Sequence, residues 1–80
     1  MNRDTIRQTI ARLGDLAAAG LNEQELLSDL LLDSFAMVDL SIALQEELHV
    51  IFVQQDLVEL DTLGDLIDLI QSKQKAASGP

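Results

Sequence analysis

The chain has 80 residues, a formal net charge of −9 and no cysteine. This length allows one small domain with a core of marginal size, and the lack of cysteine excludes disulfides and thiolate metal sites. The negative charge excludes nucleic acid as a natural partner, and the longest apolar runs fall short of the roughly 20 residues that span a bilayer, so we expect a cytoplasmic protein that does not bind membranes.

The N-terminal segment predicts an amphipathic helix from about Arg3 to Ala18. Its apolar residues recur at intervals of four, three and four, which places them on one helical face, and they are Ile6, Ile10, Leu13 and Ala17. We expect Gly20 and Asn22 to end this helix. The next segment, GLNEQELLSDLL, predicts a long loop with one helical turn and leucines that face inward.

A second helix is predicted to begin at Asp33-Ser34, where a short side chain can accept hydrogen bonds from the first amides, and to end near His49. The β-prone run VIFV (Val50–Val53) is too short to form a sheet, so we expect a buried connector. Residues Gln54–Glu59 predict one or two turns of poorly capped helix.

The last helix is marked by the sequence TLGD, in which Thr62 and Asp65 form a capping box. Its expected inward face is Leu63, Leu66, Ile67 and Ile70. The tail has no apolar period, so we expect residues 75–80 to be disordered, with a cloning remnant as one source of the last residues. The sequence therefore predicts an all-α fold over residues 1–74: a small four-helix bundle with three main helices and a short third helix.

The predicted helix from Asp33 to His49 carries two apolar faces. At about 100° per residue, one stripe faces the core and consists of Met37, Leu40, Leu44 and Leu48. The opposite stripe consists of Phe35, Val38 and Ile42, is extended by Gln45, and has Asp39 and Glu46 on one flank. An exposed apolar strip beside carboxylates is typical of a docking surface, and the alternative is that another segment of the chain covers it.

Charge is distributed very unevenly along the chain. The span from Leu13 to Ser72 contains no Lys or Arg and 13 of the 14 acidic residues. We therefore expect a negative field that steers the protein toward partners with basic patches; the alternative is that the acidic surface only maintains solubility. The basic residues are Arg3, Arg7, Arg12, Lys73 and Lys75.

Ser34 is a candidate for covalent modification and not for catalysis. A nucleophilic serine needs a nearby base, and the only histidine, His49, follows 15 residues later, or roughly 22 Å along a helix. The sequence also lacks a calcium loop, an HExxH motif and a glycine-rich phosphate loop. Taken alone, Ser34 is explained as a helix cap, with His49 as a helix C-terminal residue favoured by the dipole. An exposed hydroxyl at this position can also serve as an attachment point.

The run LLLDSFAMVDLSIALQEELHV, followed by ELDTLGDLIDLI, resembles the acyl carrier protein family. In that family a D-S-L-type motif opens helix two and a T-x-G-D-type motif opens the last helix, and the resemblance covers about Ile6 to Ile70. It implies a non-catalytic carrier whose Ser34 hydroxyl receives a 4'-phosphopantetheine arm from a phosphopantetheinyl transferase. The thiol of the arm would then hold acyl groups as thioesters.

The resemblance also implies roles for the residues around Ser34. Asp33 would serve recognition by the transferase, and the partner-facing residues would be Phe35, Val38, Asp39, Ile42 and Glu46. The implied partners are an acyl-loading enzyme, an acyltransferase or a ketosynthase of polyketide or fatty acid biosynthesis, each with a basic docking patch. The carrier itself is expected to be a monomer.

Three departures from the family pattern keep other carriers open. Leu31 stands where a glycine is common, Phe35 replaces the commoner leucine, and Gln45 replaces an acidic residue common in fatty acid carriers. A phenylalanine after the serine resembles D-alanyl carriers and some stand-alone carriers of secondary metabolism. One alternative is therefore a D-alanyl or other aminoacyl or peptidyl carrier. The last alternative is an unmodified helical adaptor, in which Ser34 is only a helix cap.

Overall fold

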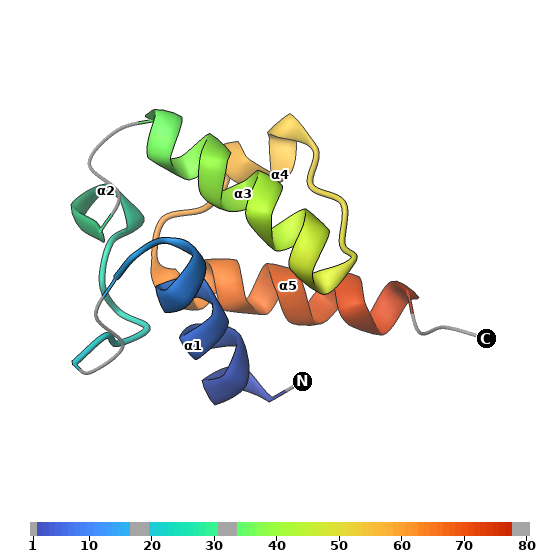
Figure 1. Ribbon diagram of the computed structural model, residues 1–80. Helices are drawn as coiled ribbons and strands as arrows, with labels where there is room; N and C mark the ends of the chain where they lie inside the picture. The colour runs from blue at the N-terminus through green and yellow to red at the C-terminus, as the bar shows by residue number, and fades with distance from the viewer. Residues whose placement is uncertain (1, 17–19, 31–33, 78–80) are drawn as a thin grey trace.

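The computed structural model describes residues 2–16, 20–30 and 34–77, and helices account for most of them (Figure 1). They are α1 (Arg3–Leu13), α2 (Leu27–Leu30), α3 (Ser34–Leu48), α4 (Gln54–Val58) and α5 (Leu63–Ala77). The N-terminal helix α1 packs against both α3 and α5. The predicted all-α bundle is confirmed: α1, α3 and α5 are the main helices, α4 is the short helix before the last one, and α2 is the single turn expected in the loop.

The core is almost entirely aliphatic, with Phe52 as its one aromatic side chain. All four residues predicted to form the inward face of α5 are completely buried, and the central residues of the predicted α3 core stripe are buried as well. Met37 and Leu48, at the ends of that stripe, are partly buried and pack against the core. Among the described residues, the fully buried large side chains are Ile6, Ile10, Leu44, Leu63, Leu66, Ile67 and Ile70.

The first helix is shorter than predicted. It ends at Leu13, so the expected extension to Ala18 is wrong. Asp15 adopts a left-handed conformation with φ of 56°, and the amide of Leu16 donates to the carbonyl of Ala11 over 2.7 Å. This is the hydrogen-bond pattern of a Schellman motif, which normally places glycine at the left-handed position. Because Asp15 occupies this position in place of glycine, the sequence gave no sign that the helix ends here.

Only some of the described leucines in the loop before α3 are buried. Leu21 and Leu27 belong to the core, as expected, but Leu26 is 40% exposed. Leu26 forms an isolated antiparallel bridge with Thr62, so its backbone is extended there. Neighbouring side chains of an extended backbone point to opposite sides, and here Leu27 points inward and Leu26 outward.

The connector between α3 and α4 alternates between buried and exposed positions. Val50 and Phe52 are buried, whereas Ile51 and Val53 point outward, so the prediction of a buried connector is correct for only half of it. Successive side chains of an extended segment point to opposite sides, and only one side of this segment faces the core.

The capping box predicted at the start of α5 is confirmed. The Thr62 amide donates to Asp65 Oδ2 over 3.0 Å, and the Asp65 amide donates to Thr62 Oγ1 over 3.2 Å. The hydrogen bond from the Thr62 amide holds the pKa of Asp65 below its ordinary value, since it stabilises the ionised carboxylate.

The far end of α5 extends beyond the prediction. The helix continues to Ala77, three residues into the segment expected to be disordered. Lys73 anchors this end: its ammonium forms an ion pair of 2.9 Å with Asp56 and lies 6.0 Å from the centre of the Phe52 ring. These contacts join residues far apart in the sequence, so periodicity in the tail could not reveal them.

Some predictions concern residues outside the described ones. They include the place of Ala17 on the apolar face of α1, Leu31 and Asp33 ahead of α3, and the disorder of residues 78–80.

Candidate functional site

The N-terminus of α3 is the centre of the candidate site. This helix begins at Ser34, as predicted, and its first turn contains no acidic residue. A helix of 15 residues directs the positive end of its dipole to that terminus, which favours a phosphate group there. A phosphate group held at this terminus would therefore be stabilised by the helix. Asp33, the predicted recognition residue, lies outside the described residues.

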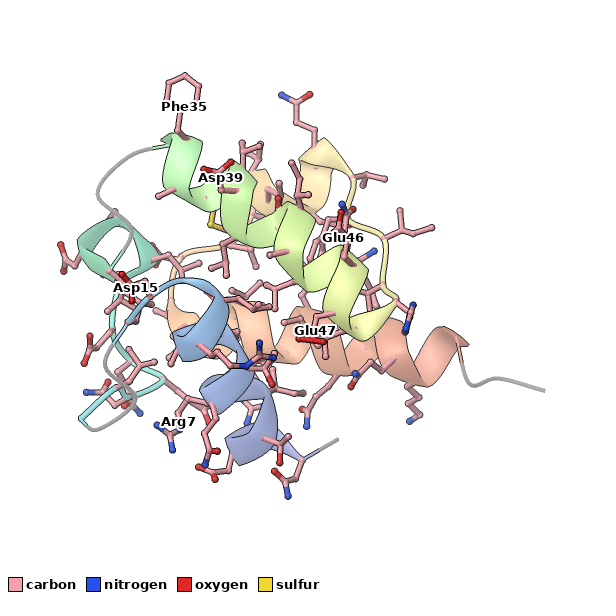
Figure 2. The ribbon with its side chains drawn as sticks, viewed as in Figure 1. Arg7, Asp15, Phe35, Asp39, Glu46 and Glu47 are labelled. Carbon is pink, nitrogen blue, oxygen red and sulfur yellow. The ribbon has the colours of Figure 1, made fainter. Side chains whose placement is uncertain are left out.

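The outward face of α3 carries an apolar strip, which we call the outer strip and define as Phe35, Val38 and Ile42. Phe35 is 79% exposed, and Val38 and Ile42 are each 47% exposed. Figure 2 shows the Phe35 ring pointing away from the bundle at the start of α3. The predicted helix with two apolar faces is thus confirmed, and no described segment covers the outer strip.

Carboxylates border the outer strip. Asp39 and Glu46 are exposed on α3, and no ion pair within the described ranges involves either of them. Glu47 is the neighbour of Glu46 but lies on the side of α3 nearer α1, where Arg12 pairs with it over 2.6 Å (Figure 2). Two adjacent glutamates therefore have different roles, one facing solvent and one joining α3 to α1.

The basic side chains are used mainly within the protein. Among the described residues, four of the five form ion pairs with carboxylates, and none of these pairs involves Asp39 or Glu46 beside the outer strip. The sequence showed the uneven distribution of charge but not this pairing. The pairs join Arg3 to Glu23 and Asp68, Arg7 to Asp4, Arg12 to Glu47 and Lys73 to Asp56.

The prediction that Gln45 extends the outer strip is wrong. Its side-chain Oε1 accepts a hydrogen bond of 2.8 Å from the Phe52 amide, so Gln45 holds the connector against α3. Ser41, which the sequence analysis did not single out, is buried, and its hydroxyl donates to the Val38 carbonyl over 2.8 Å. A buried hydroxyl bonded within its own helix explains why Ser41 is tolerated on a core-facing turn.

The segment that leads to α3 is tied to the rest of the bundle by Arg3. The guanidinium pairs with Glu23 in the loop and with Asp68 on α5, and also donates to Gln71 over 2.9 Å. The Arg3 hydrogen bond holds the pKa of Glu23 below its ordinary value, and the two carboxylates together raise the pKa of Arg3. This tether is formed by residues 20 and more positions apart, and local patterns in the sequence did not indicate it.

Backbone hydrogen bonds fasten the same segment to the start of α5. The Gly64 amide donates to the Glu23 carbonyl over 2.8 Å, and the Leu63 amide donates to the Glu25 carbonyl over 2.9 Å. A Cβ atom on Gly64 would lie 3.1 Å from the Glu23 carbonyl oxygen, so the close approach depends on glycine. The glycine of the TLGD motif thus has a packing role that the motif alone did not explain.

The described residues contain no cluster of three or more His, Asp or Glu side chains that could hold a metal ion. His49 follows the last residue of α3 in a left-handed conformation and is exposed, at the opposite end of the helix from Ser34. A base at that end cannot activate a hydroxyl at the other.

The comparisons with known proteins agree with this geometry. The sequence matches the family described as phosphopantetheine attachment site over residues 4–70, which run from the first turn of α1 to the middle of α5. The chain belongs to this family. A comparison with curated proteins gave no match.

Membership makes the chain a phosphopantetheine-binding carrier of the acyl carrier type, with 4'-phosphopantetheine as its covalently attached cofactor. Carrier domains of this family are typically not catalysts; phosphopantetheinyl transferases modify them, and partner enzymes bind them. Among the described helices of this carrier, none is long and apolar enough to cross a membrane.

Proposed function

We propose that this protein is an acyl carrier and that Ser34 is its attachment residue. The Ser34 oxygen forms a bond to the phosphorus that bears the pantetheine arm of coenzyme A. The bond from that phosphorus to the bridging pyrophosphate oxygen breaks, adenosine 3',5'-bisphosphate leaves, and the serine proton passes to a base of the transferase. The observation that supports this most strongly is the position of Ser34 as the first residue of α3, beside the outer strip, within the matched range.

The arm provides a terminal thiol, on which an acyl group is held as a thioester. The residues of this chain contribute the tether point and the surface that partner enzymes bind. Asp33 is proposed as a recognition residue for the transferase, through a metal ion or basic side chains of that enzyme. A carboxylate next to a phosphodiester repels it, so a role toward the transferase suits Asp33 better than a role toward the phosphate.

The partner-binding surface is proposed to consist of Phe35, Val38, Asp39, Ile42 and Glu46. Its apolar side chains are exposed at the helix that carries the arm, and its carboxylates have no described ion-pair partner. An acyl-loading enzyme, an acyltransferase or a ketosynthase with a basic patch would be steered toward this surface. We propose that the carrier acts in the cytoplasm as a monomer.

The cargo proposed first is an acyl intermediate of polyketide or fatty acid biosynthesis. The exposed Phe35 directly after the serine favours a second candidate, a D-alanyl or other aminoacyl or peptidyl carrier. Both candidates use the same arm, so the loading enzyme decides between them. Intact-mass measurement of the protein from its native host, with the thioester preserved, would identify the cargo.

A transferase assay tests the proposed function. Incubation with coenzyme A and a broad-specificity phosphopantetheinyl transferase is expected to add one arm to the wild-type protein and none to Ser34→Ala. Ser28→Ala is a matched control, because Ser28 is an exposed serine on α2 and should leave the modification intact. A wild-type protein that stays unmodified would instead favour the adaptor, for which Ser34→Ala would cost only about 1 kcal/mol of stability.

A further inference from the structure

Phe35 presents an aromatic ring to solvent next to the proposed tether. Among the described large apolar side chains it is the most exposed, at 79%, and it directly follows Ser34 in the first turn of α3. Its ring points away from the bundle (Figure 2), whereas Ala36 and Met37 pack against the core. The only other phenylalanine, Phe52, belongs to the core, and the chain has no Tyr or Trp.

The position of Ser34 on α3 places the start of the arm beside this ring. Helical residues four apart lie one above the other, so positions 34, 38 and 42 form one row, which continues into the outer strip through Val38 and Ile42. Phe35 lies beside the start of that row. Helical side chains lean toward the N-terminus, so the ring stands at the end of α3 where a phosphate is stabilised.

The cofactor carries an apolar group close to its phosphate. In 4'-phosphopantetheine this group is a quaternary carbon with two methyl substituents, separated from the phosphorus only by one ester oxygen and one methylene group. Neighbouring Cα atoms are about 3.8 Å apart, so an arm on Ser34 brings this dimethyl group within reach of the Phe35 ring. The amide groups and the thiol of the arm come later and are more polar.

We infer that the dimethyl group of the arm packs against the face of the Phe35 ring in the free carrier. This inference rests on the proposed function. The contact removes apolar surface of both groups from water, and the negative face of the ring attracts the weakly positive methyl hydrogens. Phe35 is then a positioning residue for the cofactor. It fixes the direction in which the arm leaves the phosphate, while the amides and the thiol remain in solvent.

Nuclear magnetic resonance of the modified protein tests this contact. The arm is introduced from coenzyme A that carries carbon-13 in its two pantoate methyl groups. An aromatic ring shifts protons above its face upfield, so we expect the methyl resonances to lie upfield of those of free 4'-phosphopantetheine. Nuclear Overhauser effects should join the methyl protons to the Phe35 ring. The assignment is clear because Phe52 is only 9% exposed and His49 lies at the other end of α3.

Phe35→Leu removes the ring but keeps an apolar side chain. Leucine is the commoner residue at this position in the family, so the variant should still accept an arm from a broad-specificity transferase. Its methyl resonances should return to the positions of the free cofactor. Val58→Ala is the matched control, since it shortens an exposed apolar side chain on α4. The upfield shift should persist unchanged in that control.

Two results would overturn the inference. One is that the methyl resonances of the wild type and of Phe35→Leu coincide; the other is that the methyl protons show no Overhauser effect to the Phe35 ring. Failure of the proposed function gives a different result, because a wild-type protein that accepts no arm has no such resonances, and the inference then falls with the function. An arm on Ser34 without the ring contact would leave the function intact and refute only the role of Phe35.

Discussion

Replacing Gly64 with alanine is expected to destabilise the bundle although alanine is the better helix former. Gly64 lies in the first turn of α5, where the loop carrying Glu23 passes close by. An added Cβ would lie 3.1 Å from the Glu23 carbonyl oxygen, 3.3 Å from its Cβ and 3.4 Å from its Oε1. The contact with the oxygen is too short, so the loop must move by a few tenths of an ångström.

That movement is opposed by the contacts that hold the loop. The Glu23 carbonyl accepts the Gly64 amide over 2.8 Å, and the Glu25 carbonyl accepts the Leu63 amide over 2.9 Å. Overpacking costs about 1–3 kcal/mol, and a weakened hydrogen bond adds about 0.5–1.5 kcal/mol. The helix propensity of alanine returns at most about 1 kcal/mol. With mid-range values of these terms the net loss should be about 2 kcal/mol, which lowers the melting temperature of a domain this size by roughly 8–16 °C.

Thermal unfolding followed by circular dichroism measures this change, and amide hydrogen exchange locates it. The amides of Leu27, Leu63 and Gly64 should exchange faster in the variant, because all three donate across the junction between loop and helix. Ser72→Ala provides a control on the exposed side of the same helix, where the substitution adds helix propensity without a clash. A Gly64→Ala variant as stable as the wild type would show that the loop yields at no cost and would refute the packing argument.

Three further predictions concern the cap at the start of α5, two aspartates with lowered pKa values, and the glutamates on α3. Thr62→Ala removes the acceptor for the Asp65 amide and should cost about 1 kcal/mol in urea unfolding, whereas unchanged stability would mean that the cap contributes nothing. Asp56 and Asp65 have lowered pKa values in the folded protein, so stability should be constant above pH 5 and fall as the pH drops through about 4 and below; a melting temperature that rises on acidification would contradict this sign. Glu46→Lys should weaken transferase binding by roughly threefold to tenfold at low salt while Glu47→Lys, on the neighbouring face, has less effect, and equal effects would argue against docking on the outer strip.

The features that the sequence predicted best depend on local patterns. The two apolar faces of α3 follow from the helical period alone, and the outer strip is exposed as expected. The capping box of α5 depends on two residues three positions apart, Thr62 and Asp65, so it too could be recognised without tertiary structure. The position of Ser34 at the start of α3 comes from the same kind of signal.

The features that the sequence did not predict depend on contacts between distant segments or on unusual backbone conformations. Near the end of α5, Lys73 binds Asp56 and lies near Phe52, and these contacts join residues that are far apart in the chain. The end of α1 depends on Asp15 adopting a conformation that usually calls for glycine. Near the site, a helical wheel could not predict that Gln45 binds the connector. The wheel gives the direction in which a side chain leaves the helix, but it does not show that the Phe52 amide lies within hydrogen-bond distance.

The most direct test of the account is to locate the phosphopantetheine group on the modified protein. After incubation with coenzyme A and a broad-specificity transferase, fragmentation mass spectrometry of the intact chain should place a single arm on Ser34. Ser41, on the same helix but buried, should remain unmodified. An arm on any other residue, or no arm on a folded wild-type protein, would contradict the assignment of Ser34 as the tether.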